Sequence, residues 1–68
     1  MIQRFHAPDM SCNHCVARIR SALEATGKTR EIQIDLNTKT VQVDTDLAVE
    51  EVRAILDEAG YPATQIPD

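Results

Sequence analysis

The sequence lacks the features that mark membrane-spanning and nucleic-acid-binding proteins. It contains no tryptophan, only two cysteines, and no apolar run approaching the ~20 residues that a membrane-spanning helix needs. Acidic residues outnumber lysine and arginine, which gives a net charge of −4, and no basic run is present. Because phosphate contacts need a basic surface, we expect neither nucleic-acid binding nor direct membrane insertion.

The chain is also short. Its 68 residues predict a single domain over residues 1–68, with a core near the lower limit for independent folding. A chain of this size has no room for the enclosed substrate pocket of a typical enzyme. We therefore expect a protein that binds a ligand and is not an enzyme.

The start of the chain bears on its compartment. Residues 1–5 lead directly into strand-like sequence without a signal-peptide pattern, which favours a cytoplasmic location. Thiols stay reduced in that compartment. Cys12 and Cys15 are therefore expected as a dithiol or a metal complex. A structural disulfide across so short a loop would add little stability.

Two segments carry apolar residues at helical spacing. The first helix is expected to begin at about Cys12, with Ser11 as its N-cap, and to end at Gly27. Its apolar stripe is Val16, Ile19 and Leu23. The second helix is expected over residues 48–59, before Gly60. Its apolar stripe is Val49, Val52, Ile55, Leu56 and Ala59.

Four further segments predict strands. Residues 31–36 and 40–44 alternate apolar and polar side chains around a turn at 37–39, which is typical of a β-hairpin. Residues 2–7 and 63–66 predict the first and last strands of the chain. The resulting order, βαββαβ, predicts an α+β, ferredoxin-like sandwich. It has a four-stranded antiparallel sheet with both helices on one face.

The chemistry of the chain concentrates in Cys12 and Cys15. Their spacing at the start of a helix turns both sulfurs toward one point, and the topology places them near the Gly60-Tyr61-Pro62 loop. The positive end of the helix favours thiolate over thiol. Two thiolates suit Cu(I), because both the ligand and the ion are soft.

The residues alone leave other interpretations of the pair open. Zinc usually takes about four ligands, and few others are evident here. A redox dithiol has the same spacing, although the Asn13-His14 insert, the preceding Ser11 and the lack of tryptophan differ from thioredoxin-like sites. The two thiols can also be incidental.

A resemblance to a known family adds to this interpretation. Residues 10–19, MSCNHCVARI, resemble the metal loop and first helix of heavy-metal-associated (HMA) domains, and most closely the CopZ-type bacterial copper chaperones. These have Met-x-Cys-x-x-Cys on a βαββαβ fold with a Gly-Tyr near the second loop, matched here by Gly60-Tyr61. Asp9 departs from the glycine usual before the methionine, and residues 26–30 depart from the usual Gly-Val connection.

The resemblance implies metal transport by ligand exchange. It predicts a cytoplasmic chaperone that holds one Cu(I) through Cys12 and Cys15. A thiolate of the partner would attack the ion, which would pass through three-coordinate intermediates. The implied partner is the metal-binding domain of a copper-transporting P-type ATPase, with a copper-responsive regulator as a second. The apo chain is expected as a monomer, and copper can bridge a dimer.

Five residues around the cysteines are candidates for auxiliary roles. Met10 carries a thioether, but in similar domains it packs inward and supports the loop. Tyr61 is implied to bring its hydroxyl near the sulfurs and to limit access to the metal. His14 is expected to point to solvent, although its nitrogen is a potential ligand. Ser11 is interpreted as a cap, and Asp9 as a potential carboxylate ligand for zinc.

Three alternatives to a copper chaperone remain. The first is a metal-binding domain or carrier for Zn(II), Cd(II) or Hg(II), with zinc as the main rival of copper. The second is a dithiol redox module. The third is the metal-binding domain of a P-type ATPase, against which Met1 and the short ending at Asp68 favour a free-standing protein.

Overall fold

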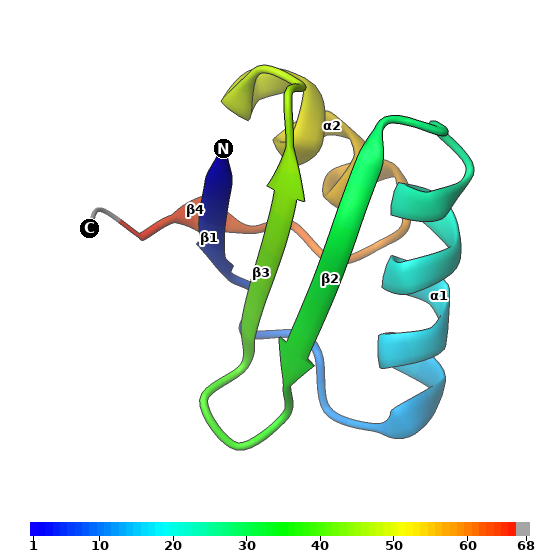
Figure 1. The fold of residues 1–68 in the computed structure, drawn as a ribbon. Helices are drawn as coiled ribbons and strands as arrows, with labels where there is room; N and C mark the ends of the chain where they lie inside the picture. Colours follow the sequence, from blue (N-terminus) through cyan, green and yellow to red (C-terminus); the bar gives the residue numbers. More distant parts are fainter. Residues whose placement is uncertain (67–68) are drawn as a thin grey trace.

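The computed structural model describes residues 1–66 and contains four strands and two helices in the expected βαββαβ order (Figure 1). The elements are β1 (Ile2–His6), α1 (Asn13–Glu24), β2 (Thr29–Asp35), β3 (Thr40–Thr45), α2 (Val49–Glu58) and β4 (Thr64–Gln65). Within residues 1–66, no helix is long and apolar enough to cross a membrane.

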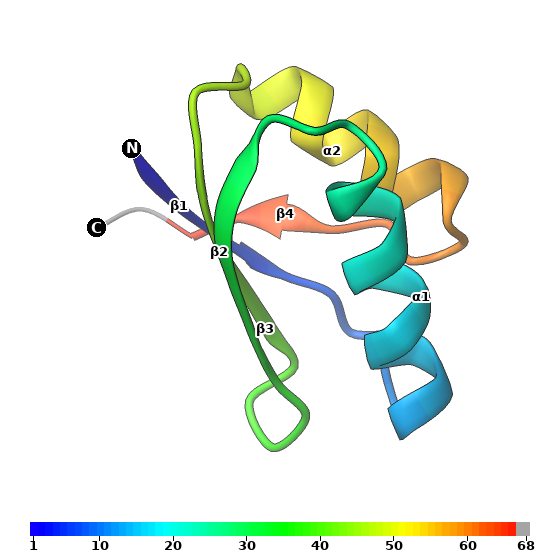
Figure 2. The same ribbon diagram turned by 45° about the vertical axis from the view of Figure 1, so that its right-hand side comes forward.

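The strands form one antiparallel sheet in the order β2-β3-β1-β4. In its centre Phe5 of β1 pairs with Val41 of β3, and Ile34 of β2 pairs with Val41 from the other side. Both helices lie on the same face of the sheet, and the other face is open (Figure 2). The predicted ferredoxin-like fold is therefore confirmed.

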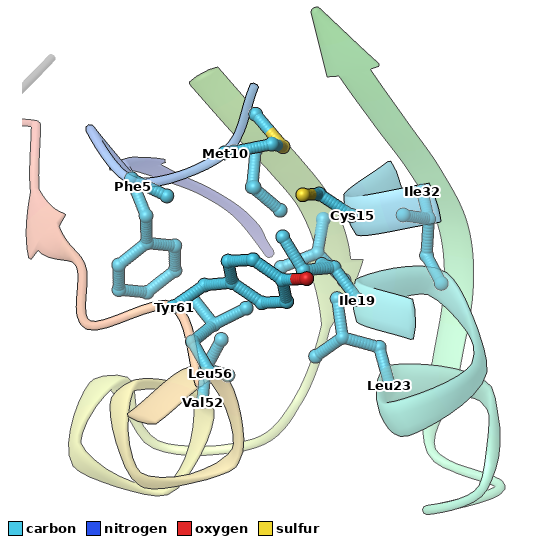
Figure 3. Close-up of a cluster of buried hydrophobic side chains, with 12 residues drawn as sticks. Phe5, Met10, Cys15, Ile19, Leu23, Ile32, Val52, Leu56 and Tyr61 are labelled. Carbon is cyan, nitrogen blue, oxygen red and sulfur yellow. The ribbon is translucent and has the colours of Figure 1, made fainter. Parts of the chain in front are cut away.

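The core lies between the sheet and the two helices (Figure 3). Alternate strand residues point into it, because successive side chains of a strand face opposite sides of the sheet. The helices contribute residues at helical spacing, as their apolar stripes predicted. The buried apolar side chains are Phe5, Ala7, Met10, Cys15, Ile19, Leu23, Ile32, Val41, Val43, Val52, Leu56 and Tyr61.

The ends of α1 differ from the expectation. Its N-cap is Cys12, whose backbone is extended (φ −153°, ψ 170°), so the assignment of Ser11 as the N-cap was wrong. No side chain caps this end. At the other end α1 stops at Glu24, before Gly27. Gly27 then adopts φ +68°, and its N–H donates to the Glu24 carbonyl at 3.0 Å.

The sheet also differs from the expectation at two edges. β2 begins at Thr29, with an irregularity in its pairing to β3 between Thr29 and Glu31. The extra residue, Arg30, forms ion pairs with Asp44 and Asp46 at 3.1 Å each. The alternation of apolar and polar residues in the sequence does not predict these ion pairs. At the opposite edge β4 spans only Thr64–Gln65.

Candidate metal-binding site

The two cysteines lie at the start of α1 with their sulfurs in contact. The Sγ atoms of Cys12 and Cys15 are 3.3 Å apart, and both thiols are free. The carbonyl of Cys12 accepts the N–H of Cys15 at 3.1 Å and that of Val16 at 3.3 Å. This first helical turn places both cysteine side chains on the same side of the chain, as their spacing in the sequence predicted.

The two sulfurs differ in their access to solvent. Cys12 is exposed, whereas Cys15 is only 7% exposed and belongs to the hydrophobic core. Cys15 is therefore held by packing, while Cys12 remains open to an approaching group. The pair combines one fixed sulfur with one accessible sulfur.

Tyr61 lies next to this pair, as the resemblance implied. It follows Gly60, whose φ of +95° turns the chain after α2, and the Tyr61 N–H donates to the Leu56 carbonyl at 2.9 Å. Its side chain is 9% exposed and shares the core with Met10 and Cys15 (Figure 3). Tyr61 thus joins the loop after α2 to the buried cluster that contains Met10 and Cys15.

Hydrogen bonds tune the acidity of Cys15. The pKa of its thiol is lowered to about 6, chiefly by a hydrogen bond from the Tyr61 hydroxyl. The backbone of Ser11 and the side chain of Cys12 act in the same direction, and burial opposes them. The pKa of Tyr61 is raised in turn, because its hydroxyl proton is held by the Cys15 sulfur. These hydrogen bonds therefore favour the thiolate form of Cys15.

Met10 has no exposed surface and lies in the core. The loop around it is fixed by backbone contacts. The Met10 N–H donates to the Ala7 carbonyl at 3.1 Å, and the Met10 carbonyl accepts the Nζ atom of Lys39 at 3.1 Å. Sequence reasoning missed Lys39, because a turn residue gives no local sign of a contact 29 positions away.

The remaining candidates lie on the surface. His14 is exposed, as expected, and so are Ser11 and Asp9. Within the described part of the chain, no group of three or more His, Cys, Asp or Glu side chains is arranged to hold a metal ion. The geometry therefore offers a pair of sulfurs, and the ligand roles considered for Asp9 and His14 stay predictions.

Comparison with known proteins identifies the family. Residues 4–62 match the family model of the heavy-metal-associated domain. The chain belongs to this family. It is 35% identical over 69 residues to the copper chaperone CopZ of Enterococcus hirae, covering 97% of this chain and 100% of that protein. It is 33% identical over 55 residues to the CopZ of Staphylococcus haemolyticus, covering 76% and 81% respectively.

A solved structure extends the likeness to three dimensions. The crystal structure of a gold binding protein superposes with a TM-score of 0.88 at 28% identity. The superposition covers 94% of this chain and 98% of that one. The expected relation to HMA domains and to CopZ-type chaperones is thus confirmed.

Proposed function

We propose that this HMA protein is a Cu(I) chaperone of the cytoplasm, which binds one copper ion through Cys12 and Cys15 and is not an enzyme. The observation that carries the proposal is the contact between an exposed and a buried sulfur, 3.3 Å apart, at the start of α1. Two soft thiolates suit a soft monovalent ion. The likeness to proteins named as copper chaperones and to a gold binding protein supports this choice of ion.

The site is suited to binding because the pKa of one ligand, the Cys15 thiol, is lowered. Cys15, with a pKa of about 6, requires little proton release at neutral pH. The hydrophobic packing around it fixes the sulfur before the metal arrives. Binding then requires mainly the movement of the exposed Cys12 side chain.

The same asymmetry suits release to a partner. An incoming thiolate reaches the metal from the exposed side, where Cys12 lies, while Cys15 and Tyr61 close the other side. Exchange then proceeds one sulfur at a time, so the ion is never released to water. The proposed acceptor is the metal-binding domain of a copper-transporting P-type ATPase, which offers a thiol pair of its own.

Metal binding is tested by an anaerobic competition titration. The reduced protein is titrated against a strong chromogenic Cu(I) chelator, with Zn(II) in parallel. We expect one Cu(I) per chain and much weaker zinc binding. Cys12→Ser and Cys15→Ser should each abolish competition, whereas the matched control Ser11→Ala should retain it, because Ser11 is exposed and caps nothing.

Two results of the titration would contradict the proposal. Zinc binding as tight as copper binding would favour a zinc carrier. Failure to compete for copper, together with ready oxidation of the dithiol, would favour a redox module.

Transfer needs its own experiment. The copper-loaded protein is mixed with the apo metal-binding domain of a copper-transporting ATPase, and the copper content of each is followed. We expect transfer faster than the release of copper to the chelator alone. The control is the same domain with its cysteines replaced by serine, which should accept nothing.

A further inference from the structure

Lys39 connects the β2–β3 turn to the loop that carries the cysteines. Its Nζ atom donates to the Met10 carbonyl at 3.1 Å, and its own carbonyl accepts the Ala7 N–H at 2.9 Å. The loop between β1 and Cys12 is thus held at both ends by one residue. Within residues 1–66 the Lys39 ammonium forms no ion pair with a carboxylate, so the Met10 carbonyl is its partner there.

The backbone of Lys39 is unusual in a way that favours a role beyond the turn. It is the only residue other than glycine with a positive φ in the described part of the chain, at +56°. Residues with a Cβ are strained in this region, which glycine occupies freely. Glycine and asparagine are the residues that turns favour at such a backbone conformation. The lysine supplies a contact that neither of those residues can make.

We propose that Lys39 is a positioning residue for the metal site, which orders the Met10–Cys12 segment before the metal binds. The ammonium fixes the Met10 carbonyl two residues before Cys12. This limits the positions that the exposed Cys12 sulfur can sample relative to the buried Cys15 sulfur. The effect on Cu(I) affinity rests on the proposed function, whereas the ordering of the loop in the apo protein does not.

The expected size of the effect follows from population arithmetic. The apparent affinity falls in proportion to the fraction of molecules whose site is competent to bind. If loss of the ammonium leaves roughly one molecule in five to one in ten competent, Cu(I) affinity falls by about five- to tenfold. Global stability need not fall, since the substitution removes one part-buried hydrogen bond and no core side chain.

The test compares substitutions that keep the turn backbone equally strained. Lys39→Met keeps the length of the side chain and removes the donor, whereas Lys39→Arg keeps a cationic donor. Lys28→Met removes the same charge from an exposed lysine whose side chain makes no hydrogen bond within residues 1–66. Amide hydrogen exchange is measured on the apo proteins at Met10 and Cys15. Ala7 serves as the internal reference, because its bond to the Lys39 carbonyl is retained.

Of these three variants, only Lys39→Met should show faster amide exchange at Met10 and Cys15. The same variant should bind Cu(I) more weakly than the wild type. In Lys39→Arg and Lys28→Met, the exchange rates and the Cu(I) affinity should both stay within about twofold of the wild-type values, because the fraction of competent molecules is unchanged. Unchanged exchange in Lys39→Met would overturn the proposal, and so would faster exchange with unchanged affinity. If the wild type binds no Cu(I), the proposed function fails, and the exchange measurement alone decides the role of Lys39.

A fourth variant separates positioning from ordinary stability. Lys39→Gly relieves the strain at φ +56° and also removes the ammonium. We expect an unchanged or higher melting temperature together with faster exchange at Met10. A merely structural role predicts that stability and loop order change in the same direction, and that result would overturn the proposal.

Discussion

At the scale of single residues, the site depends on how different the two cysteines are. They are three positions apart in the sequence, yet one is exposed and the other belongs to the core. The spacing predicted that both sulfurs face one point. It did not predict which sulfur is held by packing, because that depends on Tyr61 and Met10 arriving from other segments.

Tyr61→Phe is expected to raise the pKa of Cys15. The hydroxyl stabilises the thiolate, so its removal leaves burial, which favours the neutral thiol. The measurement is the ultraviolet absorbance of the thiolate against pH, with Cys12→Ser as the shared background so that a single thiol titrates. The midpoint should move to higher pH in the double variant. An unmoved midpoint would contradict the role given to the hydroxyl.

The same shift makes stability depend on pH. The pKa of Cys15 is lower in the folded protein, at about 6, than in the unfolded chain. Between the two values the unfolded state binds more protons, so stability rises with pH and is lost as pH falls through about 6. In Tyr61→Phe the free energy of unfolding should rise less steeply with pH, as measured by denaturant titrations at several pH values. An equal dependence of this free energy on pH in both proteins would count against the mechanism.

At the scale of elements, the order and type of helices and strands could be predicted from the sequence. The stripes of α1 and α2 and the alternation in the β2–β3 hairpin are local signals, and the structure confirms them. The start of β2 and the contact of Lys39 depend on partners distant in the chain, and the N-cap of α1 has no capping side chain to mark it. No local pattern reports such partners, which explains why these features were missed or misassigned.

The turn after α2 provides a test at this scale. Gly60 has φ +95° and open space where a Cβ would lie, so Gly60→Ala adds backbone strain without a steric clash. We expect a loss of about 1–2 kcal/mol in the free energy of unfolding. Because Gly60 precedes Tyr61, the thiolate titration of Cys15 should also shift to higher pH.

Gly27→Ala is the matched control for this prediction. Gly27 also has a positive φ, at +68°, and open space around it, but it follows α1 at the end distant from the cysteines. The Gly27→Ala variant should have a lower free energy of unfolding than the wild type, and the titration of Cys15 should be unchanged. Equal shifts in both variants would mean that the turn after α2 does not position Tyr61.

At the scale of the whole molecule, the core both stabilises the fold and supports the site. A chain of 68 residues buries few side chains, and Cys15, Met10 and Tyr61 are among them. Small domains have little stability to spare, typically about 5–15 kcal/mol. Damage to the core away from the cysteines should therefore affect metal binding only through unfolding.

Leu56→Ala tests this relation. Leu56 has no exposed surface, so its truncation should lower the free energy of unfolding by about 2–5 kcal/mol. The control Ile2→Ala, at a side chain 55% exposed, should change it by about 0.5 kcal/mol or less. Under conditions where Leu56→Ala remains folded, its Cu(I) affinity should match that of the wild type. A large loss of affinity in the folded variant would contradict the expectation.

The most direct test of the central claim is X-ray absorption spectroscopy of the copper-loaded protein, prepared at one Cu(I) per chain. A site made of Cys12 and Cys15 predicts two sulfur neighbours around the copper, supplied by the pair whose Sγ atoms already lie in contact. The signal should disappear with Cys12→Ser or Cys15→Ser. A first shell dominated by nitrogen or oxygen, or one that survives the loss of either cysteine, would contradict the account.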